Sequence, residues 1–259
     1  MPNDTTENTL SPIMTTNNKF TANHIPDQHG QRILITGANS GIGYETALEL
    51  ARKGAEVIIP ARSIEKANLA IARIKTEIPD AKLIPALLDL SSLASVRTFA
   101  DFVTEKFPGQ SLNLLINNAG VMAVPKRELT IDGFERQFAT NYLGPFLLTS
   151  LLFPLLKEQE GTRIATVASG VSNAAQIDFD NLQSERIYKP MFGAYSQSKL
   201  ADLIFQIELQ RRLTAAHGAL PTLFAATSPK VIPGGYYGPD GIGELKRVSS
   251  TSKNRASSQ

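Results

Sequence analysis

Apolar and polar positions alternate in two different ways between residues 32 and 213. Short runs rich in Ile, Leu and Val indicate buried strands, whereas longer segments with apolar residues three and four apart indicate helices. The expected strands are residues 32–36, 56–59, 82–88, 112–116 and 163–167. The expected helices are one that ends near Lys53, then residues 64–78, 93–107, 132–156 as one helix or a broken pair, and 195–213.

Two of the expected helices carry apolar residues near helical spacing. In residues 64–78 these residues are Leu69, Ile71, Ile74 and Ile78. In residues 195–213 they form a stripe of Leu200, Leu203, Ile204, Ile207 and Leu209. Because a helix buries its apolar face against the rest of a domain, we expect the second stripe to face the core.

The regular alternation of strand and helix determines the expected fold class. Such a chain forms right-handed strand–helix–strand units, which build a parallel sheet with helices on both faces. We therefore expect a single α/β domain with a doubly wound parallel sheet, of the Rossmann type with three αβα layers. Pro85 lies inside the third strand, and proline is tolerated mainly at a sheet edge. The third strand is that edge in the order 3-2-1-4-5.

Composition excludes several classes of function. The net charge is +2, from 26 basic and 24 acidic residues, which argues against a nucleic-acid partner. Cysteine is absent, so disulfides, thiolate metal sites and cysteine nucleophiles are excluded. With only three histidines, two of them near the start of the chain, we expect no metal site.

The ends of the chain differ in composition from its middle. Residues 1–18 and 247–259 are polar and without periodicity, so we expect a disordered leader and tail around a domain of residues 19–246. Residues 1–30 show no secretory signal. The apolar run 143–156 is too short and too interrupted for a membrane span, and indicates a buried helix. The expected location is the cytoplasm.

A glycine-rich turn follows the first strand and begins the first helix. It reads Thr36-Gly-Ala-Asn-Ser-Gly-Ile-Gly43. Glycines at this position allow the backbone to approach a pyrophosphate, which binds at the helix N-terminus. A tight turn with no ligand is the alternative. The place of the turn between a strand and a helix favours dinucleotide binding.

The end of the second strand bears on the choice of cofactor. Sites for NAD place a carboxylate there to bind the ribose 2′-hydroxyl group. This chain has Ala61 followed by Arg62, so no acid repels a 2′-phosphate and a guanidinium is available to bind it. The sequence therefore favours NADP over NAD, although Arg62 as an ordinary surface residue remains the alternative.

Tyr195 and Lys199 are four residues apart and share one face of the last helix. A phenol becomes a useful general acid or base near neutral pH when a nearby cation stabilises its phenolate. Ser169 follows the fifth strand, where doubly wound folds bind their ligands, and its hydroxyl is suited to orient a substrate carbonyl. Alone, the Tyr195–Lys199 pair is equally compatible with a surface pair of amphipathic side chains.

Taken together, these motifs resemble the short-chain dehydrogenase/reductase family. The glycine turn, Asn117-Asn-Ala-Gly120, Asn141, Ser169 and Tyr195-x-x-x-Lys199 occur in the family's order, and the surrounding sequence is most similar to the retinol-dehydrogenase-like branch. The resemblance runs from about residue 25 to 245. In place of the family's two serines the chain has Ala168 and Ser169, and Ser169 is aligned with the catalytic one.

The resemblance implies two sets of site residues. The catalytic set is Asn141, Ser169, Tyr195 and Lys199, with Lys199 also bound to the nicotinamide ribose and linked through water to Asn141. Asp89 is expected to cap the adenine ring, although a carboxylate at a helix N-terminus is an equal alternative. The cofactor-binding set is Gly37, Asn39, Ser40, Gly41, Ile42, Gly43, Arg62, Asp89, Leu90, Asn118, Ala119, Gly120, Tyr195 and Lys199.

One part of the family pattern is absent. We find no sixth strand and no substrate lid, because residues 217–233 are too few for a strand, a lid and a crossover helix. Residues 214–226 resemble the family's last helix, and residues 234–241 its last strand and closing loop.

These observations lead to two alternative functions. The first is an NADP-dependent oxidoreductase that transfers a hydride between nicotinamide and a carbonyl or alcohol, with a lipophilic aldehyde, ketone or retinoid-like substrate. The second is a non-catalytic or impaired NADP-binding relative, which the absent segment favours. The resemblance also implies a homo-oligomer formed through residues 132–156 and 195–213.

Overall fold

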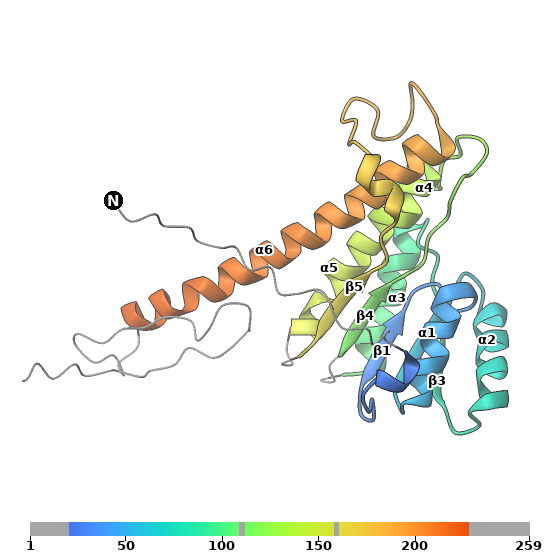
Figure 1. Cartoon of the computed structure of the whole chain (residues 1–259), viewed down its shortest axis with the longest axis vertical. Helices are drawn as coiled ribbons and strands as arrows, with labels where there is room; N and C mark the ends of the chain where they lie inside the picture. Colours follow the sequence, from blue (N-terminus) through green and yellow to red (C-terminus); the bar gives the residue numbers. More distant parts are fainter. Residues whose placement is uncertain (1–20, 109–111, 158–160, 228–259) are drawn as a thin grey trace, which may run out of the picture.

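The computed structural model describes residues 21–108, 112–157 and 161–227. Within them, five parallel strands form one sheet in the order β3-β2-β1-β4-β5 (Figure 1). The strands are β1 (Arg32–Ile35), β2 (Glu56–Ala61), β3 (Lys82–Leu87), β4 (Leu114–Asn117) and β5 (Arg163–Thr166). The predicted fold class and strand order are confirmed. Pro85 lies in the edge strand β3, opposite Ile59 of β2.

Helices cover both faces of the sheet. The α-helices are α1 (Gly41–Arg52), α2 (Ile64–Glu77), α3 (Leu93–Lys106), α4 (Arg136–Phe138), α5 (Gly144–Lys157) and α6 (Ser196–Thr227). Short helical turns are η1 (Ala22–His24), η2 (Ala139–Leu143), η3 (Gly170–Ala174) and η4 (Pro190–Tyr195). The η2 and η4 turns are π-helical and lead directly into α5 and α6.

Alternate residues of the central strands point into two separate cores. Leu34 and Leu115 pack with α3 and α5, whereas Ile33 and Ile35 pack with α1 and α2. Successive strand residues point to opposite faces, so both faces of β1 are apolar because both are covered by helices. The predicted three αβα layers follow from this arrangement.

The apolar run in the middle of the chain forms a core helix. Leu148, Leu152 and Leu156 of α5 are buried against α3 and the sheet, as the sequence predicts. The stretch Arg136–Leu156 is long and apolar enough to cross a membrane by length and composition, and about half of that apolar stretch is buried inside the protein. This is weak evidence for a membrane helix, because the core helix of a soluble protein passes the same test.

The helix expected over residues 132–156 begins later, at Arg136, and is broken. Glu135 precedes it, and its carboxylate accepts hydrogen bonds from the backbone N–H groups of Gln137 and Phe138. Asp132 lies outside the helix and accepts a hydrogen bond from the backbone N–H of Leu93, at the start of α3. The broken alternative is therefore the correct one, with π-helical η2 between α4 and α5.

The apolar stripe of α6 does not face the core, which corrects the sequence expectation. Leu203, Ile204 and Ile207 are 37%, 48% and 61% exposed. Between Ser196 and Leu213, only the first turns of α6 are buried, because this helix lies against β5, η2, η3 and η4 and then runs out beyond the sheet (Figure 1). In α2, Leu69 is likewise exposed, and small residues such as Ala67 and Ala70 allow close packing instead.

The end of α6 also differs from the sequence expectation. We expected a helix ending at residue 213, and the structure continues it to Thr227. Residues 214–220 include several alanines, the best helix former, which extend the helix. Of the segment 217–233, residues 217–227 are therefore helical. Residues 228–246 and the expected leader and tail lie outside the described part of the chain.

Gly144, at the start of α5, lies close to the backbone of Leu90, which follows β3. A Cβ atom at this position would collide with the carbonyl oxygen of Leu90. We predict that Gly144→Ala lowers the free energy of unfolding by about 1–3 kcal/mol, the usual cost of overpacking. Urea unfolding measures the loss. Gly170→Ala, where a Cβ would meet no atom within 4 Å, is the matched control. Equal stability of the two variants would contradict the prediction.

Candidate functional site

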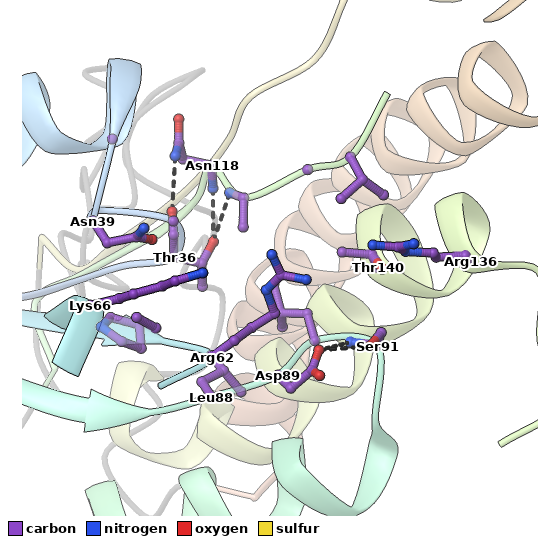
Figure 2. A pocket seen from close by; sticks show the side chains of 18 of the residues that line it. Thr36, Asn39, Arg62, Lys66, Leu88, Asp89, Ser91, Asn118, Arg136 and Thr140 are labelled. Atoms are coloured by element: carbon purple, nitrogen blue, oxygen red, sulfur yellow. Dashed lines mark hydrogen bonds between the residues drawn. The ribbon is translucent and has the colours of Figure 1, made fainter. Parts of the chain in front are cut away.

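A pocket of about 650 Å³ opens beyond the carboxyl ends of β1, β2 and β4 (Figure 2). This is where doubly wound sheets bind ligands. Most of the predicted cofactor residues line it: Gly37, Asn39, Ser40, Ile42, Gly43, Arg62, Asp89, Leu90, Asn118, Ala119 and Gly120. Gly41, Tyr195 and Lys199 are not among the lining residues.

The glycine turn packs too tightly for larger residues. Gly37 has a φ of +71°, in the left-handed region. A Cβ on Gly43 would lie 2.5 Å from the carbonyl oxygen of Gly37 and 2.5 Å from Nδ2 of Asn118. These glycines allow the N-terminus of α1, with its free N–H groups, to face the pocket. Ser40 is the N-cap of α1, and its side chain makes no capping hydrogen bond.

Thr36 joins the ends of β1 and β4 at the base of the pocket (Figure 2). Its Oγ1 accepts hydrogen bonds from the backbone N–H groups of Asn118 and Ala119, each at 3.0 Å. The side-chain amide of Asn118 donates to the carbonyl oxygen of Thr36 at 2.9 Å. The 117–120 segment is therefore fixed against the glycine turn.

Two cations lie at the end of β2. Arg62 follows β2 directly, and Lys66 lies in the first turn of α2; Figure 2 shows both side chains extending into the pocket. The sequence analysis missed Lys66. Its signal was its place in the first turn of the expected helix, three residues after the N-cap Ser63 and close in sequence to Arg62.

Asp89 lines the pocket but does not cap α3. Its Oδ1 accepts hydrogen bonds from the backbone N–H and the hydroxyl of Ser91, at 2.9 and 2.6 Å. Ser92 is the N-cap of α3. Asp89 thus lies just before the start of α3 without being its N-cap, and both alternatives, the adenine contact and a carboxylate at the helix N-terminus, stay predictions. Arg136 and Glu128, which form an ion pair, also line the pocket and were not anticipated.

Lys199 is buried at the inner end of this site. Its ammonium donates to the carbonyl oxygen of Val167 at 2.9 Å and to Oδ2 of Asp202 at 3.0 Å. A Cβ on Gly120 would lie 3.8 Å from Nζ of Lys199 and 3.3 Å from Oδ1 of Asn141. Both polar atoms therefore lie beside Gly120, which lines the pocket.

Asn141 and Tyr195 are connected through Ser198. The Asn141 amide accepts from the backbone N–H of Val121 and donates to its carbonyl and to the hydroxyl of Ser198. That hydroxyl donates to the carbonyl oxygen of Tyr195 at 2.7 Å. Asn141 lies within η2 and Tyr195 ends η4, so each comes from a π-helical turn, a geometry that is frequent at functional sites.

Ser169 is held near the same place by the backbone. It is the N-cap of η3, and its carbonyl oxygen accepts from the N–H and hydroxyl of Ser172. Val167, bonded to Lys199, lies only two residues earlier. The structure thus brings the elements that carry Asn141, Ser169, Tyr195 and Lys199 together. The catalytic roles of these four residues stay predictions.

Asp202 is a buried carboxylate that the sequence analysis did not single out. Burial raises its pKa to about 6, although the Lys199 ammonium opposes the shift. Burial also raises the pKa of Tyr142, and the charge of Asp202 adds to that shift. Among the described residues no group of three or more acidic or histidine side chains could hold a metal ion.

Comparison with known proteins decides the family. The family described as short chain dehydrogenase matches residues 31–181. The chain belongs to this family. A nicotinamide cofactor is therefore the ligand class for which the pocket is built. The glycine cradle and the free N–H groups of α1 fit the pyrophosphate of such a cofactor.

Individual relatives show which members of the family this chain is similar to. Retinol dehydrogenase 14 of Mus musculus is 45% identical over 195 residues, covering 71% of this chain and 57% of its own. Polyprenol dehydrogenase of Homo sapiens is 44% identical over 195 residues, covering 73% and 58%. This short-chain dehydrogenase thus spans less than two thirds of the length of these relatives. An uncharacterised Mycobacterium paratuberculosis protein of known structure is 39% identical, with a TM-score of 0.67 over 91% of this chain and 90% of its own.

The raised pKa of Asp202 predicts how stability depends on pH. The unfolded carboxyl group titrates near 3.8 and the folded one near 6, so the folded chain holds an extra proton between these values. The free energy of unfolding should therefore fall by about 2–3 kcal/mol as the pH rises from 4 to 6. Urea unfolding across this range measures the slope.

Other carboxylates also contribute to the pH dependence of the free energy of unfolding, so the test compares variants. Asp202→Asn should lose the part of the slope that Asp202 contributes. Asp101→Asn, which removes an exposed carboxylate from α3, should keep the slope of the wild type. If the curves of Asp202→Asn and the wild type run parallel, the buried carboxyl group does not titrate in this range.

Proposed function

We propose that this short-chain dehydrogenase is an NADP-dependent oxidoreductase, which transfers a hydride between nicotinamide and the carbonyl or alcohol group of a lipophilic substrate. The observation that carries the proposal is the pair of cations, Arg62 and Lys66, in a pocket where β2 ends at Ala61. Both charges favour a cofactor with a 2′-phosphate, and a small uncharged residue stands where NAD sites have their acid.

In this proposal, each part of the pocket binds one part of the cofactor. The N–H groups at the start of α1 would bind the pyrophosphate, and Arg62 with Lys66 would bind the 2′-phosphate. Asp89 and Leu90 would border the adenine, with Asn118 to Gly120 on the opposite side. A volume of about 650 Å³ lies within the usual range for sites of this kind. When bound, the nicotinamide supplies or accepts the hydride.

The chain's own residues would handle the proton. The hydroxyl of Tyr195 would exchange a proton with the substrate oxygen, while the Lys199 ammonium stabilises the phenolate form. Ser169 would orient the same oxygen by a hydrogen bond. Asn141 supports this arrangement through Ser198, which bonds the carbonyl of Tyr195 and so fixes the start of α6.

A lipophilic substrate is supported by two observations. The relatives are named retinol dehydrogenase and polyprenol dehydrogenase, and both names denote long isoprenoid alcohols. In this chain, Met122 and Phe192 are 58% and 79% exposed, and they stand two residues after Gly120 and three before Tyr195. Apolar side chains on both of these segments suit an apolar substrate.

The proposal includes a cytoplasmic homo-oligomer. Leu203, Ile204 and Ile207 of α6 are exposed, and exposed apolar side chains on one helix support self-association.

A second candidate is an NADP-binding protein with little or no turnover. The course of α6 favours it: this helix runs from the catalytic-site residues to Thr227 without a strand, and no sixth strand pairs with β5 within the described residues. Hydride transfer depends on fixed geometry, and misplacement by 1 Å can cost about 100-fold. Binding of NADPH without aldehyde-dependent oxidation would identify this second function.

We predict that Arg62→Ala weakens NADPH binding by about 1.5–3 kcal/mol and leaves NADH binding nearly unchanged, because a charge-assisted hydrogen bond to the 2′-phosphate is lost. Lys66→Ala should act in the same direction. Cofactor titration by fluorescence or calorimetry measures both. The control is Arg97→Ala on the exposed face of α3. Equal losses for NADPH and NADH would show that Arg62 does not bind the phosphate.

We predict that Tyr195→Phe reduces turnover of apolar aldehydes by at least about 100-fold, because the proton donor is removed while the ring is kept. The NADPH affinity of Tyr195→Phe should stay near that of the wild type, whereas Lys199→Ala should lose both turnover and NADPH affinity. The measurement is NADPH oxidation at 340 nm with a series of aldehydes. A Tyr195→Phe variant that keeps more than a hundredth of the rate would place the acid elsewhere.

A further inference from the structure

The Lys199–Asp202 ion pair is almost completely buried. The two side chains are only 5% and 3% exposed, and Nζ lies 3.0 Å from Oδ2. Removing two charges from water is costly, and replacing both partners of a buried pair by apolar residues is often neutral or stabilising, whereas removing one partner leaves the other charge buried alone. The ion pair as a whole is therefore not explained by the stability of the fold, and the direct partner of Asp202 is the lysine of the proposed site.

Two hydrogen-bond acceptors, one of them the Asp202 carboxylate, hold the Lys199 ammonium in place. An ammonium has three N–H donors, and Lys199 directs two of them to Asp202 and to the carbonyl of Val167. Within the described residues these two acceptors come from α6 itself and from the chain just after β5. They hold Nζ beside Gly120, where the pocket begins.

Few other charges compete for this position. The elements packed against α6 are η2, η3, η4, α4, β5 and, through Phe146, α5. Of these, η3 has no ionisable side chain, and the others contribute Tyr142, Tyr195, Arg136, Arg163 and Lys157. None of these residues carries a carboxylate. Asp202 is thus the one carboxylate among these elements and the buried start of α6 that can balance the charge of Lys199.

We propose that Asp202 is a positioning residue, whose carboxylate is the fixed counter-ion that keeps the Lys199 ammonium charged and in place beside Gly120. This inference rests on the proposed function for its role in the reaction, since the charge it maintains is the one that would bind the ribose and stabilise the Tyr195 phenolate. The ion pair itself can be tested without any cofactor.

Replacing the carboxylate by an amide isolates its charge. Asp202→Asn keeps the size of the side chain and an oxygen acceptor for Lys199. Burial without an opposing charge disfavours an ammonium, by as much as about 3–5 pH units for a fully buried group. We therefore expect the titration midpoint of Lys199 to fall by one unit or more in this variant, whereas Asp101→Asn leaves it unchanged.

The first measurement is an NMR titration of protein labelled with ¹³C at the lysine Cε atoms, with the Lys199 resonance assigned by its loss in Lys199→Arg. A midpoint that is the same in Asp202→Asn and the wild type would overturn the inference. If Asp202→Asn does not fold, the wild type decides. Its Lys199 resonance should inflect near pH 6, where Asp202 takes up a proton, and a flat curve between pH 5 and 7 would contradict the pairing.

The second measurement links the ion pair to the reaction. The Kd for NADPH should stay constant between pH 7 and 9 in the wild type and rise in Asp202→Asn as the pH approaches the lowered Lys199 midpoint. A shifted Lys199 midpoint with no NADPH binding by any form would keep the inference and reject the proposed function. Normal NADPH binding with an unshifted midpoint would reject the inference and keep the function.

Discussion

The join between the ends of β1 and β4 is the constraint on which the pocket depends. One hydroxyl, that of Thr36, accepts two backbone N–H groups, and the amide of Asn118 returns a third bond to the Thr36 carbonyl. These bonds bring the 117–120 segment against the glycine turn so closely that Gly43 has no room for a side chain. The base of the pocket is therefore backbone that two uncharged polar side chains hold in place, and charged side chains enter only around its rim and at its inner end.

The sequence predicts the sheet well because strand signals in this chain are local. Runs of apolar residues identify all five strands, and the missing N–H of Pro85 is enough to place β3 at the edge. Most of the residues that the family resemblance assigns to the cofactor line the pocket, because they follow strands whose ends lie side by side. In a doubly wound sheet, the strand order alone determines which strand ends lie side by side.

The features that the sequence did not predict depend on which elements pack against one another in the fold. The stripe on α6 has helical spacing, but spacing says only that one face is apolar and not which element covers it; Ile204 and Ile207 are exposed for this reason. Lys66 and Asp202 carry no motif, and they matter because a helical turn places each beside a residue that does. The π-helical turns also escape detection, because a periodicity of 3.6 residues cannot register one extra residue.

The π-helical turn η2 has a consequence for how the site can vary. A π-helical turn accommodates one residue more than an α-helical turn, and each residue advances a helix by about 100°. The extra residue in η2 therefore sets the angular phase between α4 and α5. A single deletion within η2 would turn Asn141 away from Gly120 without altering any residue that contacts it. The proposed site therefore depends on the register of two helices as much as on the identity of four side chains.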